Sequence, residues 1–266
     1  MSFTAIIQAR IGSKRLPGKV MMKLSDFDRN SEVIRIIINR VSLSKNIKNI
    51  IVATSKNKSD AQIVKFCKSK KIKYHTGSEK NVLRRVYEAS KKTKDKNLVL
   101  LTGDNPLIDY KIIDYMVDHI KKNPEVQFLT NSNFFKKDGQ RFPDGMIVSI
   151  LKKNILRLAI KKANKQDELE HPALFFYTRG REMLNIKNIK VPSKWLSKHK
   201  IRLTLDTFKD YKFIKILYEK LSKKKKYFGL VEINKFINKN SRFLKINKEI
   251  KQKLPSILII RFLLFY

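Results

Sequence analysis

Short apolar runs and longer amphipathic segments alternate along the first half of the chain. Mostly apolar runs, which are typical of buried strands, occur at 3–7, 49–53, 72–74 and 97–101. Apolar residues spaced by three and four positions, which are typical of helices, occur at 31–43, 59–68, 79–90 and 110–120. This alternation predicts a three-layer α/β/α fold with a mainly parallel central sheet.

The second half of the chain is less regular. We expect strands at 146–150 and 201–205 and helices at 151–163, 167–177 and 208–221. Ser59 is placed to cap the helix at 59–68. Because no internal repeat and no linker rich in Pro, Gly or Ser divides the chain, we predict one domain over residues 1–240 and a basic-apolar tail over 241–266.

The composition fits one sizeable α/β domain, since 42% of the 266 residues are hydrophobic. The formal net charge is +37, from 60 Lys and Arg against 23 Asp and Glu. Such an excess is typical of proteins that bind nucleic acid or an anionic membrane, and nucleic-acid binding stays open as an alternative function. We attribute most of the excess to the drift of an AT-rich genome, because the lysines are spread along the whole chain and accompany abundant Asn and Ile.

Cys67 is the single cysteine, and the four histidines include no His-x-x-x-His pair. An internal disulfide is therefore impossible, and a zinc site or a thiolate metal cluster is not expected. Cys67 lies in an amphipathic segment, which favours a packed helix residue over a nucleophile. The N-terminus does not resemble a signal peptide, so we expect a cytoplasmic protein.

The apolar stretch at 256–266 is interrupted by Arg261 and is shorter than the roughly 20 residues that span a bilayer. We therefore expect no transmembrane segment. Four roles remain open for this stretch: docking on the domain, packing in a dimer, weak contact with a membrane surface, and a terminal extension without function.

A basic loop follows the first expected strand. Residues 8–19 hold four cations, two glycines and one proline. Glycine lets backbone amides approach an anion closely, and Arg and Lys bind phosphate oxygens through charge-assisted hydrogen bonds. The loop lies at the carboxyl edge of the sheet, where ligands of such folds bind. It predicts a polyphosphate site, with a solvated basic turn as the alternative, and it matches neither the Walker A pattern nor Gly-x-Gly-x-x-Gly.

Two aspartates follow expected strands. Asp104 comes after the strand at 97–101, and Asp206 comes after the strand at 201–205. Magnesium prefers one or two carboxylates together with substrate phosphates and water, so two aspartates facing a cationic loop would suit it. The alternative is that each caps a following helix, although Asp109 and Thr207 are also placed to do so.

The loop Ala9–Lys19 resembles the Ala-Arg-x-Gly-Ser-x-Arg-Leu-Pro-Gly-Lys opening of the nucleotidyltransferases that make CMP-activated sugar acids. These include the acylneuraminate and 3-deoxy-manno-octulosonate (Kdo) cytidylyltransferases, and the most similar branch is the spore-coat polysaccharide type. Further segments resemble the family in order, at 77–85, 103–109, 143–145, 170–172 and 202–207. The resemblance spans about residues 3–220.

The resemblance implies a Rossmann-like (GT-A-like) nucleotidyltransferase, often a homodimer. Such an enzyme transfers CMP from CTP to a sugar and releases pyrophosphate in polysaccharide or glycan synthesis. It implies Asp104 and Asp206 as ligands of Mg²⁺ and, with Arg10 and Lys19, as the catalytic set. The nucleotide would contact Ala9, Arg10, Gly12, Ser13, Arg15, Lys19 and Ser78. The sugar, expected to be a 2-keto acid such as Kdo or a nonulosonic acid, would contact Asp144, Glu170 and His171.

The chain departs from the family pattern near the expected acceptor pocket. Ile147 and Ser149 stand where relatives often carry acids, and so do Asn81 and Arg84. These departures leave the acceptor sugar open. They also leave open a nucleotide-sugar-binding relative without catalysis, beside the further alternative of a transferase that uses another NTP.

Overall fold

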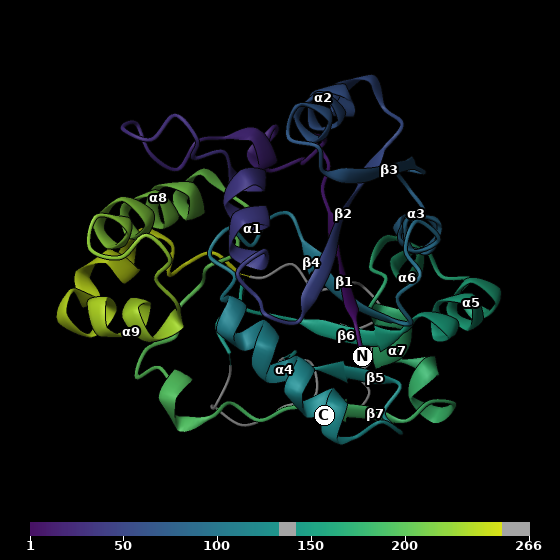
Figure 1. The fold of residues 1–266 in the computed structure, drawn as a ribbon. Coiled ribbons are helices and arrows are strands. Elements are labelled where there is room, and N and C mark those ends of the chain that lie inside the picture. The colour runs from purple at the N-terminus through teal and green to yellow at the C-terminus, as the bar shows by residue number, and fades with distance from the viewer. Residues whose placement is uncertain (133–141, 252–266) are drawn as a thin grey trace.

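A seven-stranded sheet forms the centre of the computed structural model, which describes residues 1–132 and 142–251 (Figure 1). The strand order is β3-β2-β1-β4-β6-β5-β7. The strands are β1 Phe3–Gln8, β2 Ile47–Ser55, β3 Lys73–Gly77, β4 Asn97–Thr102, β5 Phe128–Thr130, β6 Ser149–Lys152 and β7 Ile186–Asn188. β1 to β4 are mutually parallel, and β6 runs antiparallel to both of its neighbours. The predicted mainly parallel sheet is therefore confirmed.

Helices cover both faces of this sheet. They are α1 Val33–Val41, α2 Ala61–Ser69, α3 Val82–Ser90, α4 Tyr110–Lys122, α5 Lys153–Lys162, α6 Gln166–Glu170, α7 Leu174–Tyr177, α8 Phe208–Ser222 and α9 Leu230–Lys239. One hydrophobic cluster joins α1, α2, α4, α8 and α9 to one face, and α3, α5 and α7 join a second cluster on the other face. Figure 1 shows the two groups on opposite sides of the strands. The predicted three-layer architecture is confirmed.

The sequence of β1 follows from its central position. Ile7 belongs to the first cluster and Ile6 to the second, and both are fully buried. A strand that is covered on both faces has no solvated side, so its sequence is apolar throughout rather than alternating. This is why the expected strands at 3–7, 49–53 and 97–101 were recognisable from the sequence.

Three expectations about local structure are wrong. The segment 201–205 forms no strand, because only Arg202 makes an isolated bridge, to Asp144. The helix expected at 167–177 is two short helices, α6 and α7, since Pro172 disfavours helical geometry at His171. Ser59 does not cap α2, because residues 58–60 form a 3₁₀ turn that places Asp60 at the N-cap.

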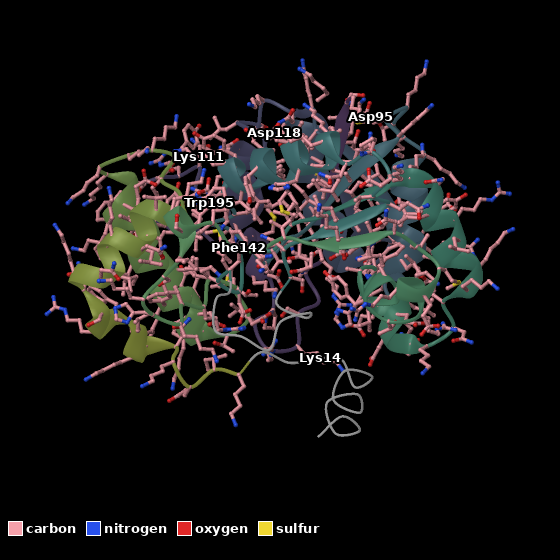
Figure 2. The ribbon with its side chains drawn as sticks, turned by 90° about the horizontal axis from the view of Figure 1, so that it is seen from below. Lys14, Asp95, Lys111, Asp118, Phe142 and Trp195 are labelled. Atoms are coloured by element: carbon pink, nitrogen blue, oxygen red, sulfur yellow. The ribbon has the colours of Figure 1, made fainter. Side chains whose placement is uncertain are left out.

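Figure 2 shows the interior and the charged surface together. Trp195 is 1% exposed and packs edge-on against Tyr115 of α4, with ring centroids 5.2 Å apart. Nitrogen-tipped side chains project all around the molecule in this view, as expected if the lysines occupy the surface broadly. Cys67 is fully buried in α2, which agrees with a packed helix residue, and burial raises the pKa of its thiol to about 11.

The start of the predicted tail is ordered against the domain. A 3₁₀ segment at Ser241–Ile246 contacts α8 and α9, and Asn247 is 3% exposed. The domain boundary at residue 240 stays a prediction. The apolar stretch at 256–266 lies outside the described residues. Within the described ranges, the helices are too short or too polar to cross a bilayer.

Asp109 joins two helices that are distant in the sequence. Its carboxylate is fully buried and accepts hydrogen bonds from Lys111 N of α4 and from Leu230 N of α9, each at 2.9 Å. Gly229 lies beside it, where a Cβ would come within 2.2 Å of Asp109 Oδ2. Asp109 therefore supplies an acceptor to the otherwise unpaired amides at the N-termini of two helices.

We predict that Asp109→Ala lowers the free energy of unfolding by about 2–4 kcal/mol, because two charge-assisted bonds to buried amides are lost. Urea unfolding measures this quantity. Asp118→Ala, in the same helix with a side chain 46% exposed, is the control and should change stability by less than about 0.5 kcal/mol. Equal effects of the two substitutions would contradict the role of Asp109.

Candidate functional site

Three segments from distant parts of the chain meet at the carboxyl edge of the parallel strands. The basic loop leaves β1, Asp104 follows the adjacent β4, and Asp206 precedes α8. Gly103 N donates to Gln8 O at 2.7 Å, and a Cβ on Gly103 would come within 2.8 Å of that oxygen. Leu205 N donates to Asp104 O at 2.8 Å. These backbone contacts fix the three segments side by side.

Lys19 lies at the centre of this edge. Its Nζ donates to Asp104 Oδ2 at 3.0 Å, to Asp206 Oδ1 at 2.9 Å and to Leu205 O at 2.8 Å. Gly18, at φ 73°, adopts the left-handed turn that leads into Lys19. Burial by itself would lower the pKa of Lys19, but the two carboxylates outweigh burial and raise it. Lys19 therefore stays charged and bridges the two aspartates.

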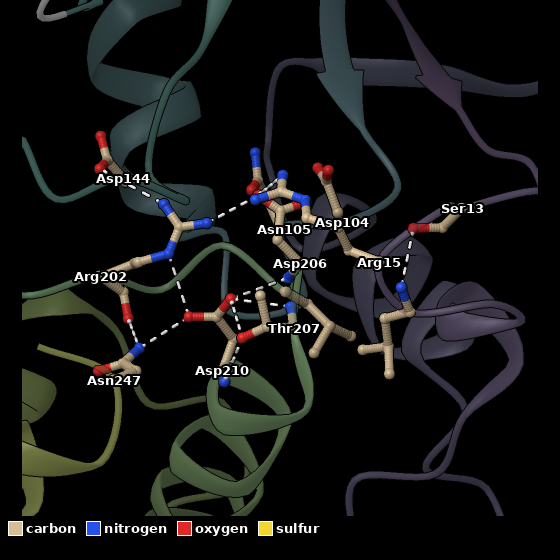
Figure 3. Close-up of polar contacts among 12 residues, drawn as sticks. Ser13, Arg15, Asp104, Asn105, Asp144, Arg202, Asp206, Thr207, Asp210 and Asn247 are labelled. Atoms are coloured by element: carbon tan, nitrogen blue, oxygen red, sulfur yellow. Dashed lines mark hydrogen bonds and ion pairs between the residues drawn. The ribbon is translucent and has the colours of Figure 1, made fainter. Parts of the chain in front are cut away.

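Asp206 contacts three cations, of which Figure 3 shows Arg15 and Arg202. Its Oδ1 accepts from Lys19, and its Oδ2 accepts from Arg202 at 2.7 Å and lies 3.1 Å from Arg15 Nη2. Asp206 is only 6% exposed, and burial alone would raise the pKa of its carboxyl. Lys19, Arg15 and Arg202 lower the pKa instead. The carboxylate is therefore ionised throughout the neutral pH range.

Neither Asp104 nor Asp206 caps a helix. Asp109 caps α4, and Thr207 caps α8 by accepting from Asp210 N. Asp104 is oriented by Thr102 Oγ1, which donates to its Oδ1 at 2.6 Å, and its side chain keeps 26% of its exposure. Asp109 and Thr207, rather than Asp104 and Asp206, are therefore the helix caps.

The residues of the basic loop that are predicted to bind the nucleotide differ in the partners they already have. Arg10 is partly exposed and donates to Glu170 Oε1 at 3.2 Å, with Glu79 Oε1 4.0 Å away. Ser13 N donates to Ile11 O at 2.7 Å, so this amide has an acceptor within the loop. Gly12 N has no acceptor among the described residues.

Two further members of the loop differ in exposure. Ala9 is buried, with its amide bonded to Ala53 O at 3.1 Å. Lys14 is exposed and lies at the rim in Figure 2. Arg15 contacts Asp206 and is therefore better placed than Lys14 to bind phosphate at the site.

Two of the predicted substrate residues, Glu170 and Asp144, contact different segments of the site. Glu170 ends α6 and contacts Arg10, and His171 follows it in an exposed position. Asp144 lies in the Pro-Asp-Gly turn, with its Oδ2 3.8 Å from Arg202 Nη1. Ser78, which is predicted to contact the nucleotide, lies just before α3 and accepts from Asn81 N at 3.0 Å. The structure thus brings Glu170 to the basic loop and Asp144 to the Asp206 segment.

The departures from the family pattern have a structural setting. Ser149 is buried in β6, and its Oγ lies 3.1 Å from Thr130 Oγ1 and 3.3 Å from Tyr177 Oη. Ile147 is partly buried and packs against the first hydrophobic cluster, the one that includes α1 and α4. Neither side chain carries charge to the expected acceptor side.

Sequence reasoning missed Arg202 and Asp210 as parts of the site. Asp210 is fully buried and accepts from Thr207 N at 2.9 Å and from Arg202 Nε at 3.0 Å. The Thr-x-x-Asp spacing of Thr207 and Asp210 is a capping-box signal that the sequence does contain. Among the described residues, no three His, Cys, Asp or Glu side chains gather as a ready metal cluster.

Comparison with known proteins identifies relatives. A model of the cytidylyltransferase family matches residues 4–250. The spore coat polysaccharide biosynthesis protein SpsF of Bacillus subtilis is 28% identical over 220 residues, which cover 81% of this chain and 85% of that protein. An 8-amino-3,8-dideoxy-manno-octulosonate cytidylyltransferase of Shewanella baltica is 31% identical over 127 residues, which cover 47% of this chain and 49% of that protein.

A solved structure also resembles this fold over nearly its whole length. A cytidylyltransferase from Leptospira borgpetersenii superposes with a TM-score of 0.81 and 28% sequence identity, covering 96% of this chain and 100% of that chain. The similarity therefore extends through the carboxyl edge and the segments around Asp104 and Asp206.

The charge state of the site predicts how stability varies with pH. The pKa of Asp206 lies below the ordinary 3.8, so its stabilisation is complete above pH 3.8 and is lost as the pH falls through the lower folded value. The pKa of Lys19 lies above 10.5, so its stabilisation is complete below pH 10.5. We predict that Asp206→Asn lowers the free energy of unfolding by about 3 kcal/mol, equally between pH 5 and 8.

Urea unfolding from pH 3 to 8 measures this difference, which should narrow below pH 3.8. The control is Asp26→Asn, whose exposed ion pair with Lys215 should contribute less than about 1 kcal/mol. A difference that already changes between pH 5 and 8 would show that another group dominates.

Proposed function

This chain belongs to the cytidylyltransferase family, and we propose that it transfers CMP from CTP to a 2-keto sugar acid and releases pyrophosphate. The nucleotidyltransferase activity follows from the family. The observation that carries the proposal is the pair Asp104 and Asp206, which faces the cationic loop across the ammonium of Lys19. The acceptor class is proposed from the Shewanella relative, whose name specifies an amino-dideoxy-octulosonate.

The two aspartates fit a magnesium ion that arrives with a nucleotide. In the structure a cation, the ammonium of Lys19, lies within 3.0 Å of one oxygen of each carboxylate. Two carboxylates that share one cation, with Asp104 partly exposed, match the preference of Mg²⁺ for few protein ligands and several phosphate or water oxygens. When bound there, the ion would neutralise charge on the phosphates and on the attacking oxygen.

The residues of the basic loop supply the other half of the chemistry. Arg10 and Lys19 would bind the triphosphate, with Arg15 assisting, so that charge on the departing pyrophosphate is stabilised. Each of these cations is paired with a carboxylate in the structure, and the phosphates of the nucleotide would replace those carboxylates as partners. Lys19 would thereby leave the space between Asp104 and Asp206.

The transfer itself is one displacement at phosphorus. An acceptor hydroxyl oxygen forms a bond to the α-phosphorus, the bond from that phosphorus to the β-phosphate bridging oxygen breaks, and the hydroxyl proton passes to water. Catalysis rests on positioning and on charge stabilisation. In this proposal, Asp144, Glu170 and His171 would contact the sugar. The proposal also includes the cytoplasmic homodimer expected from the sequence.

A second candidate is a nucleotide-sugar-binding relative without catalysis. The uncharged residues at 147 and 149 favour it, since Ser149 is committed to a buried hydroxyl cluster. This candidate shares nucleotide binding with the first and differs only in turnover.

We predict selective binding of CTP over UTP, GTP and ATP, strengthened by Mg²⁺. Calorimetry with each nucleotide, with and without Mg²⁺ and at two salt concentrations, measures it. Pyrophosphate release with a panel of 2-keto sugar acids then tests turnover. Binding without turnover would support the relative without catalysis, and equal, salt-sensitive binding of all four nucleotides would show that the lysines bind anions by charge alone.

We predict that Asp104→Asn lowers kcat by about 100-fold or more, because the partly exposed carboxylate is lost from the site. Asp206→Asn should have the same effect. Pyrophosphate release measures turnover, and thermal unfolding verifies that each variant is folded. Asp118→Asn in α4 is the control. Normal turnover in both site variants would overturn the assignment of the two aspartates.

A further inference from the structure

The guanidinium group of Arg202 contacts three carboxylates beside the proposed nucleotide site. Arg202 donates through Nη2 to Asp206 at 2.7 Å and through Nε to Asp210 at 3.0 Å, and its Nη1 lies 3.8 Å from Asp144 Oδ2. The arginine side chain is only 8% exposed. Figure 3 shows it between the Pro-Asp-Gly turn and the start of α8.

The backbone that carries Asp206 has little support from the sheet. Residues 201–206 form no strand. Two backbone hydrogen bonds hold this segment, from Leu203 N to Asp144 O at 2.7 Å and from Leu205 N to Asp104 O at 2.8 Å. Asn247 Nδ2 donates to Arg202 O at 3.2 Å and to Asp210 Oδ1 at 2.9 Å. The orientation of the Asp206 carboxylate therefore depends strongly on its side-chain partners.

The three cations on Asp206 are not equivalent. Arg15 and Lys19 belong to the basic loop, and the Arg15 side chain is 40% exposed. Under the proposed function both turn to the triphosphate. Arg202 is held on its other side by Asp210, which is fully buried and fixed at the N-terminus of α8 by Thr207. Arg202 is thus the cation that stays with Asp206 when the nucleotide binds.

We propose that Arg202 is a positioning residue that keeps Asp206 oriented toward Asp104 after Lys19 and Arg15 have moved to the nucleotide. The inference rests on the proposed function. Because its remaining nitrogen lies near Asp144, Arg202 also ties the Asp206 carboxylate to the turn proposed to border the sugar. The Arg202 side chain then aligns the nucleotide side of the site with the acceptor side.

Lysine cannot replace this arrangement. Arginine presents its donors in a rigid planar fork, whereas the lysine ammonium is a single point on a flexible stem. Arg202→Lys keeps the charge but cannot reach Asp206, Asp210 and Asp144 at once. Changing a residue that orients a metal ligand typically weakens metal affinity or activity by about 10- to 100-fold.

The test is the affinity of the CTP-bound protein for Mn²⁺ without acceptor, so that no turnover occurs. Electron paramagnetic resonance measures the free ion, and the same titration of CTP without protein gives the Mn²⁺ that the nucleotide binds by itself. We expect Arg202→Lys to weaken Mn²⁺ binding by about 10-fold or more. In the pyrophosphate assay, kcat should fall by about 10- to 100-fold, while KM for CTP changes by less than about threefold. Thermal unfolding verifies that the variant is folded.

A matched control is Arg35→Lys in α1. Arg35 donates through two nitrogens to the single carboxylate of Glu32, with Nε 2.6 Å from Oε2, and it lies outside the site. Its replacement should leave Mn²⁺ affinity unchanged. If Arg202→Lys does not fold, Asn247→Ala, which removes the support of both Arg202 and Asp210, should weaken Mn²⁺ binding in the same direction.

The outcomes separate this inference from the proposed function. Wild-type protein that binds no Mn²⁺ with CTP would overturn the proposed function and this inference with it. Wild-type binding that Arg202→Lys and Asn247→Ala leave unchanged would overturn the role of Arg202 alone, and a loss of thermal stability with unchanged Mn²⁺ affinity and kcat would show that Arg202 is purely structural.

Discussion

The ammonium of Lys19 between Asp104 and Asp206 is the interaction on which the rest of the site depends. It joins the loop after β1, the loop after β4 and the segment before α8, which are far apart in the sequence. Without a shared cation, the buried carboxylate of Asp206 and the partly exposed carboxylate of Asp104 would repel each other. The lysine holds both carboxylates in one geometry, so the edge of the sheet is assembled before any ligand arrives.

The distribution of acids explains how so basic a chain builds a defined site. Only 23 acidic residues stand against 60 basic ones, yet Asp109, Asp206 and Asp210 are almost fully buried. Each is bonded to a helix N-terminus, to an arginine or to a lysine. A buried carboxylate with several donors is costly to disturb, whereas an exposed lysine contributes little to stability. The positive excess therefore lies mostly outside the interactions that fix the fold and the site.

The two halves of the molecule differ in how much of their structure is local. The parallel strands and amphipathic helices of residues 1–122 carry their own patterns, and the structure confirms them. The short strands β5 and β7 and helix α9 were not anticipated, and 201–205 was wrongly expected to be a strand. β5 and β7 are three residues long and pair with strands distant in the sequence, and α9 packs against α8. Contacts with distant residues therefore decide these structures, rather than a repeating apolar pattern.

The sequence by itself determined the fold class, the position of the basic loop and the two strand ends that carry Asp104 and the cationic residues. It could do so because strands covered on both faces are apolar throughout and because glycines and cations stand together in the sequence. Only the tertiary structure decided that Lys19 bridges the aspartates, that Asp109 joins α4 to α9, and that Arg202 serves three carboxylates. Ion pairs between buried side chains depend on segments brought together by packing, and no local spacing encodes that geometry.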